Sequence, residues 1–100
     1  VLMTQANRIT DPPDPVVSAY INRDDRGVGI GYQKFKELYD AFNDTIRDVG
    51  RKNQVMVIDL AREVPADKKY LYDLVHFNDA GSQLAARIIA ARLKGIIAPR

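Results

Sequence analysis

The chain has 100 residues, about the size of one small domain, and its 46% apolar and 28% charged residues are typical of a folded protein. A formal net charge of +2, with basic residues scattered among acidic ones, argues against nucleic-acid binding. The absence of cysteine excludes disulfides, thiolate nucleophiles and thiolate metal sites, and no apolar stretch is long enough to span a bilayer.

The first third of the chain predicts little regular structure. The opening "VLMT" is a short apolar run that predicts a strand. The prolines of "DPPDP", residues 11–15, remove backbone donors and exclude a helix or strand there. Residues 16–21 favour a short helical turn, and we expect turns and irregular chain through residues 24–31.

The middle third predicts a helix followed by a buried strand. Over residues 35–49 the apolar side chains recur at helical spacing, and Gly50 is well placed to end that helix. Residues 54–60, "QVMVIDL", are then almost continuously apolar and rich in β-branched residues, which indicates a buried strand. The apolar helical positions are Phe35, Leu38, Tyr39, Phe42, Ile46 and Val49.

The last predicted element is a helix from about Asn78 to Lys94. Asn78 is a favoured N-cap residue, and Gly95 stands where a glycine often ends a helix. Two strands joined by a long connection that contains a helix predict a parallel crossover unit. Because so few elements cannot cover a buried parallel strand, we expect residues 1–100 to be part of a larger three-layer α/β domain.

The only histidine, His76, follows Asp73 by three residues, just before the last helix. A histidine can act as a general base near neutral pH if one ring nitrogen donates to a carboxylate while the other stays free. At this spacing the two side chains can meet within a single turn. The pattern alone is weak evidence, because most lone histidines are surface residues or structural members of a core.

The surrounding sequence, "VMVIDLAREVP" and "YLYDLVHFNDAGSQLAARIIAARL", closely resembles the last conserved block of the SGNH (GDSL) hydrolase family. The matching residues are Asp73, His76, Asn78 and Gly81. Residues 1–5, "VLMTQ", and the helix over 35–49 are loosely similar to earlier parts of that family. The resemblance implies the C-terminal part of a flavodoxin-like, three-layer α/β/α domain with a parallel sheet.

The resemblance also implies an activity and roles. It implies hydrolysis of carboxylic esters through an acyl-serine intermediate, with His76 as the general base and Asp73 orienting its ring. It implies no metal and no organic cofactor. The substrate, whether an acylated carbohydrate, a lipid or another ester, and the localisation stay open.

The family's nucleophile block is not found in this chain. Ser82 lies within the last predicted helix and Ser18 lacks a strand-to-helix turn before it, and Thr4 and Thr10 are no better placed. We therefore expect the serine and the oxyanion donors to come from a preceding segment or a companion chain. We expect this chain alone to be inactive.

Several alternatives stay open at this point. The whole chain can be a non-catalytic α/β fragment or an interaction module in which His76 is structural. "GVGIG", residues 27–31, lacks the spacing of a phosphate-binding loop, and "NRDDR", residues 22–26, favours a solvated charged turn over a metal site. Asp59, at the end of the second strand, favours structural hydrogen bonding over catalysis.

Overall fold

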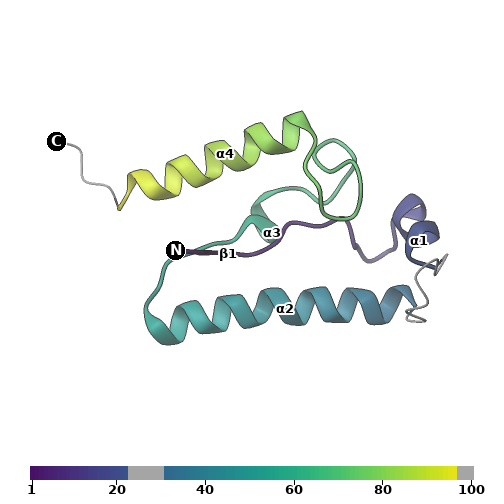
Figure 1. Ribbon diagram of the computed structural model, residues 1–100, viewed down its shortest axis with the longest axis horizontal. Coiled ribbons are helices and arrows are strands. Elements are labelled where there is room, and N and C mark those ends of the chain that lie inside the picture. The colour runs from purple at the N-terminus through teal and green to yellow at the C-terminus, as the bar shows by residue number, and fades with distance from the viewer. Residues whose placement is uncertain (23–30, 97–100) are drawn as a thin grey trace.

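The computed structural model describes residues 1–22 and 31–96 of the chain (Figure 1). Within these residues it is a small mixed α/β structure with four helices and a two-stranded parallel sheet, which confirms the predicted α/β class. No helix among them is long and apolar enough to cross a membrane. The elements are β1 (Leu2–Met3), α1 (Pro15–Asn22), α2 (Tyr32–Asn53), β2 (Val57–Ile58), α3 (Leu60–Glu63) and α4 (Asp79–Lys94).

The two strands pair in parallel, as the crossover pattern predicts. Leu2 lies opposite Val57 and Met3 opposite Ile58. The Leu2 N–H donates to the Met56 carbonyl at 2.9 Å. Both strands are shorter than predicted. β2 is two residues long because Gln54, the first residue of the predicted strand, caps α2, and Leu60, the last, already lies in α3, a helix that the sequence did not predict.

Helix α2 extends past the predicted end at Gly50 and stops at Asn53. Gln54 takes a left-handed conformation, with φ of 54°, and serves as the C-cap. Gly50 instead lies where the returning chain comes very close, because a Cβ there would overlap Val57 Cγ2 and would be 3.0 Å from the Val55 carbonyl oxygen. The prediction that Gly50 ends the helix was wrong; the residue permits close packing of α2 against β2.

Helix α1 is longer than the single turn predicted around residues 16–21. Pro15 occupies its first position, where its missing N–H costs nothing, so the exclusion of a helix over residues 11–15 was wrong at this last proline. The Asp14 carboxylate accepts a hydrogen bond from the Val16 N–H at 3.0 Å, which satisfies one of the free donors at the helix start. Most of the irregular chain predicted for residues 24–31 lies outside the described residues.

Helix α4 begins and ends as predicted. The Asn78 side chain accepts a hydrogen bond from the Gly81 N–H at 2.8 Å, and Gly95 is the C-cap. Figure 1 shows α4 and α2 running along opposite sides of the two strands. Ile58, which is fully buried, and Ala85 lie in the core cluster on the α4 side of the sheet.

Candidate active site

The candidate site is a tight loop between residues 70 and 78, which leads directly into α4. Leu71 and Phe77 form an antiparallel bridge. The Asn78 N–H donates to the Tyr70 carbonyl at 3.0 Å, and the Tyr72 N–H donates to the His76 carbonyl at 3.1 Å. These bonds close the loop like a small hairpin, with Asp73 and His76 near its tip.

The structure brings Asp73 and His76 together. Asp73 Oδ2 lies 2.8 Å from His76 Nδ1. The other carboxylate oxygen, Oδ1, accepts backbone N–H bonds from Val75 at 2.9 Å and from His76 at 2.8 Å. The two oxygens therefore act separately, since Oδ1 fixes the carboxylate to the backbone and Oδ2 contacts the ring.

The electrostatics favour an ionised Asp73. Partial burial by itself raises the pKa of the Asp73 carboxyl, but the hydrogen bonds from the Val75 and His76 N–H groups and from the His76 ring together outweigh it. The resulting pKa lies below its ordinary value. Asp73 is therefore a negatively charged acceptor at neutral pH, as a ring-orienting carboxylate must be.

The His76 ring is open to solvent on the side away from Asp73. Its side chain is 64% exposed, against 39% for Asp73. The Tyr72 ring stacks beside it, with centroids 5.7 Å apart and the planes 17° from parallel. Within residues 1–22 and 31–96 no hydrogen bond is formed by His76 Nε2, so the nitrogen that would take up a proton is available.

Asn78 and Gly81 support this loop from the start of α4. Besides capping the helix, the Asn78 side-chain amide donates to the carbonyls of Lys68 at 3.2 Å and Lys69 at 2.9 Å. A Cβ at Gly81 would overlap the Tyr70 carbonyl oxygen, so only glycine fits there. Both residues matched the family pattern in the sequence, and in the structure they hold α4 against the loop.

The four serine and threonine side chains considered as nucleophiles in the sequence form no hydrogen bond to the His76 ring in the described structure. Thr4 Oγ1 donates to Asp59 at 2.7 Å and accepts from the Ala61 N–H at 3.0 Å, and Thr10 Oγ1 donates to the Pro12 carbonyl at 2.8 Å. Ser18 in α1 accepts from the Asn22 amide at 3.3 Å. Ser82 is an exposed residue of α4. None of these side chains forms a hydrogen bond to the His76 ring in the part of the chain that the structure describes.

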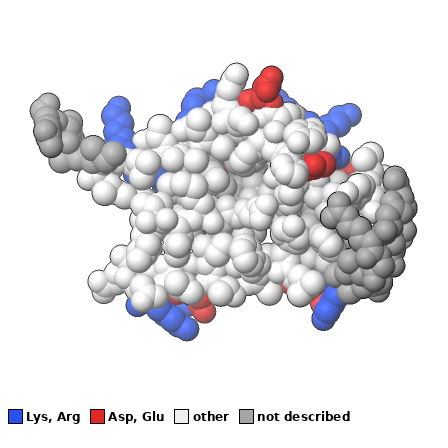
Figure 2. Space-filling view, viewed as in Figure 1, with Lys and Arg blue, Asp and Glu red and all other residues white. Residues whose placement is uncertain are grey.

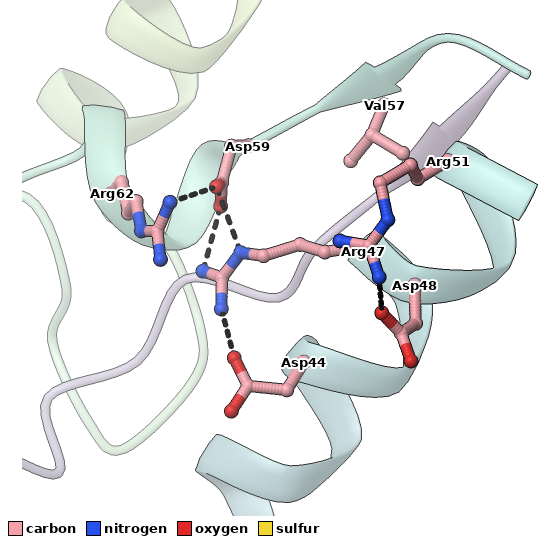
Figure 3. A pocket seen from close by; sticks show the side chains of 7 residues that line it. All are labelled: Asp44, Arg47, Asp48, Arg51, Val57, Asp59 and Arg62. Atoms are coloured by element: carbon pink, nitrogen blue, oxygen red, sulfur yellow. Dashed lines mark hydrogen bonds and ion pairs between the residues drawn. The ribbon is translucent and has the colours of Figure 1, made fainter.

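A second polar region surrounds Asp59 at the end of β2, beside an open hollow of about 430 Å³ (Figure 3). Arg47 reaches Asp59 from α2 through two hydrogen bonds, of 2.8 and 2.9 Å, and Arg62 of α3 lies 3.7 Å from the same carboxylate. The bonds from Arg47, with a smaller contribution from Thr4, outweigh burial and hold the pKa of Asp59 below its ordinary value.

The lining of this hollow is balanced in charge. Arg47 also pairs with Asp44 at 2.8 Å, and Arg51 pairs with Asp48. Because the arginine charges are matched by aspartates, the hollow is explained as a structural ion-pair network, in line with the structural interpretation of Asp59 from the sequence. Among the described residues no group of three or more possible metal-ligating side chains is present. "GVGIG" and "NRDDR" lie almost entirely outside the described residues.

Sequence reasoning missed the roles of two residues at this site, Tyr72 within the loop and Arg8 outside it. Tyr72 was noticed only as part of the block, and its stacking on His76 follows from the hairpin geometry rather than from any spacing rule. Arg8 is buried beneath the loop, and no pattern in "QANRIT" distinguishes it from a surface arginine. Comparison with protein-family models, curated proteins and solved structures found no match.

Proposed function

We propose that this chain supplies Asp73 and His76 to a Ser-His-Asp triad that hydrolyses carboxylic esters. The observation that carries the proposal is the 2.8 Å contact between Asp73 Oδ2 and His76 Nδ1, with Asp73 Oδ1 anchored by two backbone N–H groups. This arrangement leaves Nε2 as the proton acceptor, which is what a general base for a hydroxyl nucleophile requires.

The proposed reaction proceeds in two halves. His76 Nε2 removes the proton from a serine hydroxyl as its oxygen attacks the ester carbonyl carbon, and Asp73 stabilises the imidazolium that forms. His76 then gives that proton to the leaving alcohol, and the acyl group remains on the serine. A water molecule attacks the acyl-serine in the second half, with His76 again as the base, and releases the carboxylic acid.

The serine and the oxyanion donors belong, in this proposal, to a companion segment or chain that completes a three-layer SGNH-like domain. The dimensions of the described structure and its exposed apolar surface support a companion segment. The radius of gyration, 15.3 Å, exceeds the roughly 13 Å of a compact 100-residue domain. The strands pair over two residues only, and Met3 on β1 is exposed, as is an apolar row on α2 formed by Leu38, Phe42 and Val49.

The charge distribution favours the same conclusion. In Figure 2 most charged side chains lie along the upper and lower rims of the view, and the band between them, over the strands, is formed by uncharged residues. An uncharged band along a short, open sheet edge is a surface on which a neighbouring strand or helix can pack. The companion segment is expected to cover it.

The alternative is a non-catalytic α/β module with a structural His76. One observation favours it: the bonds from Asp73 Oδ1 to the N–H groups two and three residues ahead form an Asx turn, which occurs in many loops without catalytic function. The two proposals differ in what they predict for turnover.

The test is hydrolysis of p-nitrophenyl acetate by the intact protein, which carries this chain together with its companion segment. We expect His76→Ala and Asp73→Asn each to lower kcat by roughly 100-fold or more, because proton transfer by a positioned base contributes that much. Lys68→Ala, an exposed change on the same segment, is the matched control and should leave kcat unchanged. Undiminished turnover in His76→Ala would remove His76 from the mechanism and leave the non-catalytic alternative.

A further inference from the structure

Arg8 is a buried arginine that the proposed triad does not use. It lies in the chain after β1 and is only 5% exposed. Arginine is rarely buried to this extent unless its guanidinium is fully engaged. Here Nε and Nη2 both donate to Asp14 Oδ2, at 3.2 and 2.6 Å.

The remaining donors of Arg8 hold the loop that carries Asp73 and His76. Arg8 Nη1 donates to the Leu71 carbonyl at 3.2 Å. Its backbone N–H donates to the Leu74 carbonyl at 2.8 Å. These two carbonyls stand on either side of Tyr72 and Asp73, so one residue fixes the loop both before and after the aspartate.

The exposure of the catalytic pair makes this support necessary. The side chains of His76 and Asp73 are 64% and 39% exposed, and the contacts described above for them all lie within the loop. Their placement relative to anything outside the loop is set by the loop backbone. Hydrogen bonds from Arg8 hold that backbone on the side of the chain after β1, and hydrogen bonds from Asn78 hold it on the α4 side.

We propose that Arg8 is a positioning residue for His76, which rests on the proposed role of His76 as general base. The hydrogen bonds from its guanidinium and its backbone N–H fix the position and orientation of the loop relative to the chain that follows β1. Asp14 holds the guanidinium in turn, and it also accepts from the N–H groups of Val16 and Val17 at the start of α1. Helix α1, Arg8 and the catalytic loop thus form one connected unit.

The charge state of the Arg8–Asp14 pair is constant at physiological pH. The hydrogen bonds from Arg8 hold the pKa of the Asp14 carboxyl below its ordinary value, against the opposing effect of burial. Arginine stays protonated at any physiological pH. Both members of the Arg8–Asp14 pair therefore stay charged at physiological pH, and the pair does not act as a pH-dependent switch.

The test compares two arginine-to-lysine variants of the intact protein. Arg8→Lys keeps the charge near Asp14 but loses the planar fork that reaches Asp14 and Leu71 together. Arg47→Lys is the matched control, because Arg47 also binds an aspartate through two donors, at Asp59, and its hydrogen bonds within the described residues go to Asp44 and Asp59 and not to the loop. For each variant, steady-state kinetics are measured with p-nitrophenyl acetate, and the His76 ring is observed separately by NMR.

We expect Arg8→Lys to lower kcat about tenfold or more with KM changed far less, since a displaced catalytic group affects the chemical step. The Nδ1 proton signal of His76, which reports its bond to Asp73, should weaken or shift in Arg8→Lys and stay unchanged in Arg47→Lys. If Arg8→Lys retains the kcat and ring signals of the unmodified protein, Arg8 only stabilises the fold and the inference is wrong.

The two proposals fail in different ways. If the intact protein shows no esterase activity, the proposed function fails, while the ring signals still decide whether Arg8 positions His76. Should Arg8→Lys fail to fold, Asp14→Asn provides the second variant, because it keeps Arg8 and its two loop carbonyls and removes only the charged anchor. A His76 ring signal in Asp14→Asn identical to that of the unmodified protein would also overturn the inference.

Discussion

At the scale of single residues, the two Asp73 carboxylate oxygens have different partners, and the contact of Oδ2 sets the tautomer of the His76 ring. A carboxylate only accepts hydrogen bonds, so a neutral His76 ring that contacts Oδ2 through Nδ1 must carry its proton on Nδ1. Nε2 then presents a lone pair to solvent. This tautomer is a direct consequence of the 2.8 Å contact, and it can be measured without knowledge of the substrate.

The predicted measurement is the ¹⁵N NMR of the His76 ring at a pH where the ring is neutral. Because His76 is the only histidine, its signals need no assignment by mutation. We expect Nδ1 to be protonated in the unmodified protein. In Asp73→Asn an amide N–H can donate to Nδ1 instead, and we expect the proton to move to Nε2. An Nε2-protonated ring in the unmodified protein would contradict the geometry.

Some contacts of single residues at this site could be predicted from the sequence, and others could not. Spacing alone predicted that Asp73 and His76 can meet, because three residues within one turn bring side chains to the same side. The role of Arg8 could not be predicted in this way, since it reaches the loop from a distant part of the chain, and the stacking of Tyr72 on His76 depends on the hairpin shape of the loop. A buried arginine 63 positions from the carbonyl that it binds leaves no local pattern.

At the scale of elements, two helical glycines show why boundaries are harder to predict than elements. Gly50 follows an amphipathic run and looks like a helix stop, yet it lies inside α2 beside Val57. Gly81 lies in the first turn of α4 against the Tyr70 carbonyl. A glycine that ends a helix and one that admits a neighbouring chain look alike until the neighbour is known. The element types of β1, α2, β2 and α4, by contrast, followed correctly from periodicity and caps, whereas the short helix α3 was not predicted.

Gly81→Ala tests the close packing of α4 against the loop of residues 70–78. Its Cβ would overlap the Tyr70 carbonyl oxygen, and backbone cannot move aside as a flexible side chain can. We expect the free energy of unfolding of the intact protein to fall by about 1–3 kcal/mol, measured by urea denaturation, even though alanine is the better helix former.

Gly95→Ala is the control within the same helix. Its nearest neighbour, the Arg92 carbonyl oxygen, would lie at an ordinary 3.5 Å, and Gly95 has a right-handed conformation that alanine adopts easily. Its unfolding free energy should change by no more than about 0.5 kcal/mol. If the two variants lost equal amounts of unfolding free energy, the close approach of the Tyr70 carbonyl oxygen would not be the reason for glycine at position 81.

At the scale of the whole molecule, the sequence predicted the parallel crossover and the order of β1, α1, α2, β2 and α4, but it did not predict helix α3. It could not predict the strand lengths, because these depend on where α2 is capped at Gln54 and where α3 begins at Leu60. The predicted three-layer domain requires elements beyond the two strands and four helices described. In the function proposed above, a companion segment would cover the exposed apolar row on α2 and the uncharged band over the strands.

The central claim is that His76, held by Asp73, activates a serine supplied by the companion segment. Covalent labelling of the intact protein with a fluorophosphonate probe, followed by peptide mass spectrometry, tests it most directly, because such probes react with serines activated by a base. We predict one labelled serine outside residues 1–100, with the labelling rate reduced roughly 100-fold or more in His76→Ala. Labelling that is absent in the unmodified protein, or equally fast in His76→Ala, would contradict the claim.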